Sequence, residues 1–147
     1  MTMEDNKASA RRFVDEVINR GNLALIDELT GPNFVDHSAA PGVPPTIEGA
    51  KAFFAMLRSA FPDLHVTIDD QIAEGDKVVQ RSTTRGTMKG EFAGMPASGK
   101  EATWETIHII RFADGKTVEH WSVQDQLGML QQLGFAEAPG QPAGVAG

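Results

Sequence analysis

The sequence predicts an α+β domain, in which helices come first and cover one face of a curved antiparallel sheet that comes second. Up to residue 60 the apolar residues recur at helical spacing, whereas from residue 64 to residue 124 they alternate with polar residues, as in half-buried strands. Asp114-Gly115 is a strong turn signal between the last two alternating segments, which indicates a hairpin.

The first helix is predicted over residues 6–20, and Gly21 ends it. Its apolar positions share one face: Ala10, Phe13, Val14, Val17 and Ile18. Asn22 can cap a second, short helix with an apolar stripe of Leu23, Ile26 and Leu29. The segment TGPNF at 30–34 should close this helix, because glycine and proline interrupt helical structure. We therefore expect two helices in an antiparallel hairpin.

A very short strand at Phe34 and Val35 should lead into a loop in which three prolines prevent regular strand pairing: Pro41, Pro44 and Pro45. A third helix is predicted over residues 48–60. Its buried stripe is Ala50, Phe53, Phe54 and Leu57. Pro62 requires this helix to end before it.

Four strands are predicted after the third helix, from the segments 64–69, 78–85, 102–112 and 117–124. A last helix follows Asp125, with Leu127, Leu130 and Leu133 at helical spacing. Residues 135–147 show no period. We expect one domain over residues 1–134, followed by a flexible tail.

Composition excludes several classes of function. The formal net charge of -7 and the scattered basic residues disfavour nucleic-acid binding. The absence of cysteine excludes disulfides, thiolate catalysis and cysteine-ligated metals. The polar start lacks the apolar core of a signal peptide and no apolar run is long enough to span a membrane, so a cytoplasmic protein without a membrane partner is expected.

No phosphate-binding loop, dinucleotide fingerprint or HExxH motif occurs, and histidines adjoin acids only in DH at 36–37 and EH at 119–120. The sequence therefore predicts neither a metal nor a cofactor. Any chemistry must come from polar groups that converge inside the sheet.

Strand alternation selects the candidate groups. Trp104 and His108 share one face of segment 102–112, while Glu119, Trp121 and Asp125 share one face of segment 117–124. If the face with Arg81 is the concave one, Arg81 would be a half-buried cation that needs Glu119 or Asp125 as its partner. Such a cavity would have the composition of a binding pocket.

Each candidate also has a purely structural interpretation. Asp125 is well placed to cap the last helix, Arg81 could form a structural ion pair, and His108 could be satisfied by its neighbours. His37, beside the proline-rich loop, could simply be a surface residue. His65 and His120 are expected to face solvent.

Several motifs of the sequence resemble those of a known family. FVDH in the first strand, then GEFAGMPASGK, IHIIRFADGKTVEHW and DQLGMLQQLG in this order and spacing, are similar to the SnoaL-like polyketide cyclase or ester cyclase group of the NTF2-like superfamily. The resemblance runs from residue 8 to residue 134. It implies a cone-shaped α+β barrel, with three helices packed on a strongly curved sheet around a deep pocket.

The resemblance also implies chemistry. Characterised cyclases of this group close a ring by intramolecular aldol condensation without metal or cofactor, using an aspartate as general acid/base and a histidine that polarises the substrate. By position Asp125 matches the aspartate and His108 the histidine. The matching substrate-binding positions are His37, Arg81 and Trp121, with Trp104 and Glu119 expected beside them.

This chain also departs from relatives of the fold. Met88 stands where many relatives carry a histidine, which puts in doubt any mechanism that needs a second base there. Thr83 stands where the Asp-Arg-Asp set of limonene epoxide hydrolases would need an acid, and the lack of tyrosine disfavours ketosteroid isomerase chemistry. Three hypotheses follow: a cofactor-independent enzyme acting on an apolar carbonyl compound, a non-catalytic small-molecule binding protein, and an interaction domain. A homodimer through the outer sheet face, near Thr103, Ile107 and Ile109, is expected.

Overall fold

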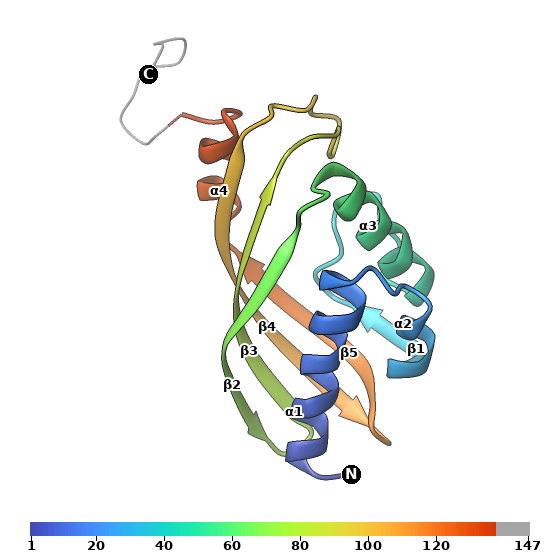
Figure 1. Ribbon diagram of the computed structural model, residues 1–147. Coiled ribbons are helices and arrows are strands. Elements are labelled where there is room, and N and C mark those ends of the chain that lie inside the picture. The colour runs from blue at the N-terminus through green and yellow to red at the C-terminus, as the bar shows by residue number, and fades with distance from the viewer. Residues whose placement is uncertain (138–147) are drawn as a thin grey trace.

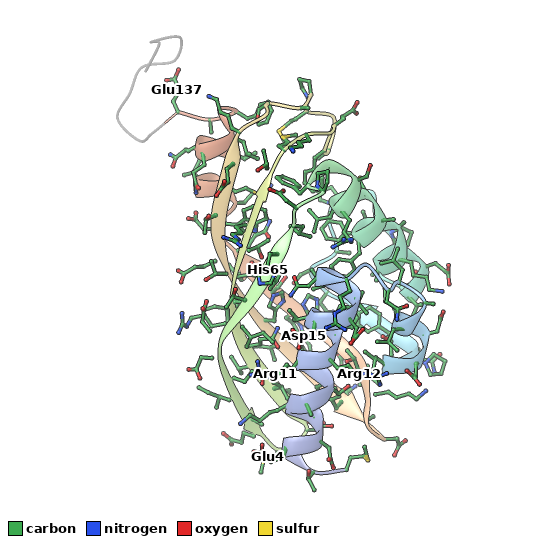
Figure 2. All side chains as sticks on the ribbon, in the orientation of Figure 1. Glu4, Arg11, Arg12, Asp15, His65 and Glu137 are labelled. Atoms are coloured by element: carbon green, nitrogen blue, oxygen red, sulfur yellow. The ribbon has the colours of Figure 1, made fainter. Side chains whose placement is uncertain are left out.

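The first helical segment contains two kinds of helix. The computed structural model describes residues 1–137 and opens with α1 (Met3–Arg12), which continues into the π-helix η1 (Phe13–Asn19). Ala10, Val14 and Val17 are buried, as the apolar spacing predicts. The charged side chains of the same helices are exposed and are labelled in Figure 2: Glu4, Arg11, Arg12 and Asp15.

The remaining helices are α2 (Leu25–Leu29), α3 (Ile47–Ala60) and α4 (Gln126–Leu133). Within residues 1–137 the three helices expected before the sheet are thus present, the first of them continuing as a π-helix, and α4 is the last helix predicted after Asp125. Thr46 caps α3 by accepting a hydrogen bond from the Gly49 N–H at 3.2 Å. The helix ends at Ala60, two residues before Pro62, as predicted.

Residues 1–137 form a sheet of five strands in the order β1-β5-β4-β3-β2. They are β1 (Thr30–Asp36), β2 (His65–Glu74), β3 (Lys77–Thr87), β4 (Glu101–Ala113) and β5 (Lys116–Gln124). Strands β2 to β5 form the expected antiparallel meander. The β4–β5 turn places both Asp114 (φ 51°) and Gly115 (φ 77°) in the left-handed region that tight hairpins require. Figure 1 shows the twisted sheet, with α1, α2 and α3 on one side of it.

Strand β1 corrects the sequence prediction. It spans seven residues rather than two, includes the TGPNF segment, and pairs in parallel with β5, the last strand. Pro32 is tolerated because β1 lies at the edge of the sheet, where one side needs no ladder hydrogen bond. The register shifts between Thr30 and Val35, around this proline. The first and last strands of the chain are thus neighbours.

The core of residues 1–137 includes two apolar clusters on the sheet. The larger cluster gathers buried residues of α3, β4 and α4 with those of the connecting loops: Ala60, Phe61, Leu64, Met88, Ala102, Trp104, Met129 and Leu133. The smaller cluster, at the other end of the sheet, contains Ala10, Val78 and Phe112. Phe135, the first residue of the predicted tail, packs against the larger cluster, while residues 138–147 lie outside the described part of the chain.

Candidate functional site

A polar belt separates the two apolar clusters on the inner face of the sheet. Along β4 the inward residues change from apolar Ala102 and Trp104 to polar Thr106 and His108, and back to apolar Ile110 and Phe112. Pairing across the sheet extends this belt to β3 and β5. It consists of Gln80, Ser82, Thr84, Thr106, His108, His120 and Ser122.

The belt is polar where a core would be expected to be apolar. Gln80, Ser82, Thr84 and Thr106 are each at most 7% exposed. Burying polar groups costs free energy unless they find partners, so a buried polar row on a concave face is typical of a binding site rather than of a structural core.

Three side chains form a hydrogen-bonded chain at one end of this belt. Asp36 Oδ1 lies 2.9 Å from His120 Nδ1, and His120 Nε2 lies 2.8 Å from His108 Nδ1. The residues come from the three neighbouring strands β1, β5 and β4. Each is partly accessible, with 22% of the His120 side chain and 23% of the Asp36 side chain exposed. We call this set the Asp36–His120–His108 relay.

The chemistry of the three groups fixes the direction of the relay. An ionised carboxylate can only accept, so His120 Nδ1–H donates to Asp36. In a neutral His120 the Nε2 atom must then accept, and His108 Nδ1–H donates to it. His108 Nε2 is therefore left with a lone pair, which is the requirement for a general base.

The environment keeps His108 neutral. Burial, the positive charge that His120 can carry and, in opposition, the carboxylate of Asp36 together lower the pKa of His108 to about 3. Burial alone would raise the pKa of Asp36. The hydrogen bond and charge of His120, with the Ser38 N–H at 2.9 Å, instead hold that pKa below 3.8. At neutral pH Asp36 is thus ionised, and the imidazole of His108 is neutral, with its lone pair on Nε2.

The outer face of the sheet carries a second acid and histidine pair. His37 Nε2 lies 2.7 Å from Glu119 Oε2, and the His37 ring stacks on Trp121 at 4.7 Å between centroids. Arg111 donates to the other oxygen of Glu119, and the hydrogen bonds from His37 and Arg111 lower the pKa of Glu119. Glu119 and Trp121 pair in register with Arg111 and Ile109, which are outward residues of β4. His37 contacts both of them, so these three expected substrate-binding residues lie on the outer face and are not brought together with His108.

Arg81 also lies on the outer face. Its exposed guanidinium is 3.7 Å from both Asp69 and Glu105. Arg81 therefore forms a structural ion pair on the surface and is not a half-buried cation in a cavity. On β3 the inward residues are the alternate ones, such as Gln80 and Ser82. Trp104 does face inward, at 5% exposure.

Asp125 stands at the N-cap of α4. Its Oδ1 accepts a hydrogen bond from the Gly128 N–H at 2.9 Å, and the residue is exposed. By strand parity it continues the outer face of β5, after Val123, so it is not brought together with His108. The capping interpretation is confirmed.

Sequence reasoning missed Asp36 and His120. The prediction that His120 faces solvent is wrong, because its ring lies on the inner face, between Asp36 and His108. The dipeptides DH at 36–37 and EH at 119–120 were the signal from which these residues could have been found. Paired in parallel, they place one acid and histidine pair on each face of the sheet, as Val35↔Glu119 and Asp36↔His120 show.

Within residues 1–137, no three or more histidine or acidic side chains are arranged to hold a metal ion. No helix in that range is both long and apolar enough to cross a membrane.

Comparison with known proteins finds a matching family, similar relatives and similar solved structures. The family model described as SnoaL-like polyketide cyclase matches residues 8–133. The aklanonic acid methyl ester cyclase of Streptomyces sp. (strain C5) is 32% identical over 114 residues, which cover 75% of this chain and 67% of that protein. The nogalonic acid methyl ester cyclase of Streptomyces nogalater is 29% identical over 125 residues, covering 79% and 88%. The solved structure of TsrD from Streptomyces laurentii superposes with a TM-score of 0.84 at 32% identity, covering 92% of this chain and 99% of that one.

Proposed function

Because this chain belongs to the SnoaL-like polyketide cyclase family, we propose that it closes a ring in a polyketide-derived carbonyl compound, with His108 as general base. The observation that supports this role is the continuous Asp36–His120–His108 relay on the inner face. The reaction is an intramolecular aldol addition. It needs one group that first removes and then returns a proton.

The relay can perform this proton transfer. His108 Nε2 takes a proton from the carbon next to a carbonyl, and the C–H electron pair becomes the enolate. The Nδ1 proton of His108 can shift to His120, so that the positive charge rests beside the carboxylate of Asp36. This shift offsets the burial that disfavours a charged His108.

Ring closure then conserves all atoms. The enolate carbon attacks a second carbonyl of the same molecule, forming one C–C bond and an alkoxide. The proton on His120 Nε2 returns to His108 Nδ1 as His108 Nε2–H gives its proton to this alkoxide. The relay is thereby restored, and no oxidant, metal or cofactor is required. Ser122, directly across from His108 on β5, is the donor that we assign to the enolate oxygen.

The test is ring closure of aklanonic acid methyl ester, the compound that appears in the names of three relatives. The purified chain, dialysed against a chelator, should convert it into a product of the same mass and different chromatographic retention. Binding of the ester without any conversion would contradict catalysis and favour a small-molecule binding protein.

Asp125 is the competing general acid/base. Asp125→Asn is expected to leave kcat/KM within about threefold and to lower stability by about 1 kcal/mol or less, because only a helix cap is weakened. Steady-state kinetics with thermal unfolding measure both quantities. A loss of turnover larger than that of His108→Gln would assign the chemistry to Asp125 instead.

The outer face supports a second proposal, a homodimer. Ile72, Val79, Ile109 and Trp121 form one registered row across four strands, and Ile107 and Val123 lie in the next row. Ile72 is 60% exposed, Ile107 51% and Val123 78%. Glu105 and Arg111 flank this apolar band on β4, so two antiparallel copies crossing there would set opposite charges against each other.

Ile107→Lys is therefore expected to convert a dimer into a monomer, because it places a charge at the centre of the apolar band. Sedimentation velocity measures the mass directly. Leu127→Lys is the matched control, since Leu127 is 53% exposed but lies on α4. A wild-type protein that sediments as a monomer would refute the interface.

A further inference from the structure

The inner face of the sheet carries a second set of linked hydrogen bonds, on the β3 side of His108. Arg11 Nη2 donates to Gln71 Oε1 at 3.2 Å, and Gln71 Nε2 donates to Gln80 Oε1 at 3.1 Å. We call this set the Arg11–Gln71–Gln80 series. Gln71, Gln80, His108 and Ser122 pair in register, one after the other, across β2, β3, β4 and β5. The series therefore ends directly beside the proposed base.

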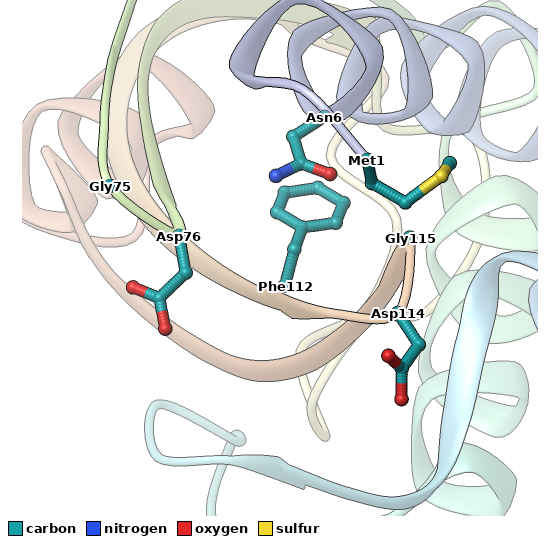
Figure 3. Close-up of a pocket in the computed structure, with 7 residues that line it drawn as sticks. All are labelled: Met1, Asn6, Gly75, Asp76, Phe112, Asp114 and Gly115. Carbon is teal, nitrogen blue, oxygen red and sulfur yellow. The ribbon is translucent and has the colours of Figure 1, made fainter.

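Helix α1 is anchored over this part of the inner face. Ala10 is packed in the smaller apolar cluster. Figure 3, a view of the cavity of about 230 Å³ at this end of the sheet, shows the Asn6 amide of α1 over the Phe112 ring of β4. These contacts hold the end of α1 beside β2, where Arg11 donates to Gln71.

The chemistry of the partners fixes the orientation of both amides. The Lys7 carbonyl can only accept, so the Gln71 atom 3.2 Å from it is the Nε2 donor. Arg11 can only donate, which makes the other Gln71 atom Oε1. Gln71 Nε2 also donates to Gln80, so the Gln80 atom that it meets is Oε1. The Nε2 amide group of Gln80 is thus directed away from Gln71.

Gln80 Nε2 is the free end of the series. Within residues 1–137 it donates no hydrogen bond, although the residue is only 3% exposed. In the same range the side-chain nitrogen and oxygen atoms that are both unpaired and completely buried are Asn6 Oδ1 and Ser82 Oγ. Gln80 Nε2 is not one of them, so it keeps some accessible surface, and a bound molecule can supply its missing acceptor.

Ring closure by aldol addition places negative charge on two oxygen atoms in turn. The first is the enolate oxygen, to which Ser122 is assigned. The second is the oxygen of the carbonyl under attack, because the C=O π pair moves onto it as the C–C bond forms. A donor aimed at this oxygen stabilises the charge as it develops. Ser122 and Gln80 flank His108 on opposite sides, so one donor is available for each oxygen.

We propose that Gln80 Nε2–H donates to the oxygen of the carbonyl under attack, and that Gln71 and Arg11 position it. This role rests on the proposed function, and it requires a substrate whose two carbonyl groups reach both sides of His108. The series ends in the cation of Arg11, whereas the Asp36–His120–His108 relay ends in a carboxylate. The cation polarises the amides toward donation and the carboxylate favours proton uptake, so each assists a different step of one reaction.

The test separates ring closure from proton removal, which does not need Gln80. In D₂O, Gln80→Met is expected to lower kcat for ring closure of aklanonic acid methyl ester about 10²- to 10³-fold, the usual effect of removing one such donor. The recovered ester should still gain deuterium faster than in protein-free buffer or with His108→Gln, because the base is intact. Mass spectrometry measures both reactions. Gln126→Met, at an exposed glutamine of α4, is the matched control.

Gln80→Glu is the second variant, in case Gln80→Met does not fold. It keeps the side-chain size and the acceptor for Gln71, but an ionised carboxylate has no donor. The same loss of ring closure is expected, with circular dichroism to verify folding. Ring closure at the wild-type rate in a folded variant of either kind would overturn the role of Gln80. Equal losses of ring closure and deuterium uptake would also overturn it, because Gln80 would then support the whole site.

A wild-type chain that neither closes the ring nor speeds deuterium uptake would instead overturn the proposed function, and the role of Gln80 with it. Gln71→Met tests the positioning: it is expected to lower kcat about tenfold, with little change in KM. Combined with Gln80→Met it should add little further loss, because both residues act through one donor. Fully multiplicative losses would overturn the positioning role of Gln71.

Discussion

His108→Gln is expected to lower kcat/KM for ring closure by about 10²- to 10⁴-fold, the usual contribution of a positioned general base. Glutamine keeps a polar side chain of similar reach but cannot take up a proton. The loss should fall on kcat rather than on KM, because the group acts on the reacting proton and not on the remote parts of the substrate. Steady-state kinetics at pH 7, with circular dichroism to verify folding, measure the effect.

The relay also predicts the effect of changing Asp36. Asp36→Asn should also lower kcat, because the carboxylate that stabilises a charged His120 is gone. The double variant should be little worse than His108→Gln alone, since groups that act as a unit are not additive. Fully multiplicative losses would contradict a relay, and full activity of His108→Gln would contradict the proposed base.

Acidification from about pH 6.5 to about pH 4 is expected to reduce the free energy of unfolding through His108 by an amount on the order of 3 kcal/mol. The pKa of His108 is about 3 in the folded protein and 6.5 ordinarily. Between these values the unfolded chain binds a proton that the folded chain does not. The contribution of His108 is therefore complete above pH 6.5 and is lost progressively as the pH falls toward 3.

Urea unfolding at several pH values measures this loss. Between about pH 4 and about pH 6 the slope of the free energy of unfolding against pH should decrease in His108→Gln by up to the slope that one bound proton contributes. His65→Gln, at an exposed histidine, is the matched control. The lowered pKa of Asp36 acts in a different window, below 3.8, where protonation of the carboxylate removes its stabilising contribution. Superimposable slopes for wild type and His108→Gln would show that His108 is not held neutral by the fold.

Hydrophobic periodicity located most of the fold. Helix α3 and strands β4 and β5 lie within one or two residues of their predicted ranges, because long periodic segments bury one face and their sequences record it. Strand β1 was the main miss. Its Gly31-Pro32 pair reads locally as a helix terminator, and only the partner strand β5, more than eighty residues away in the chain, makes it a strand.

The site was predictable only in part. Alternation correctly places His108 and Trp104 on one face of β4, but it cannot say which face is concave, since both faces carry polar residues. Because of that ambiguity, Arg81, Trp121 and Glu119 were predicted to lie on the inner face of the sheet. The relay required the parallel register between β1 and β5, which no local pattern encodes.

That register also has a consequence for the order of folding. Asp36 and His120 meet only when β1 docks beside β5, and closing a loop of this length is entropically slow compared with forming the local hairpins of β2 to β5. The Asp36–His120–His108 relay should therefore be the last part of the molecule to assemble. Nearly the whole domain must leave the ribosome before these three side chains can meet.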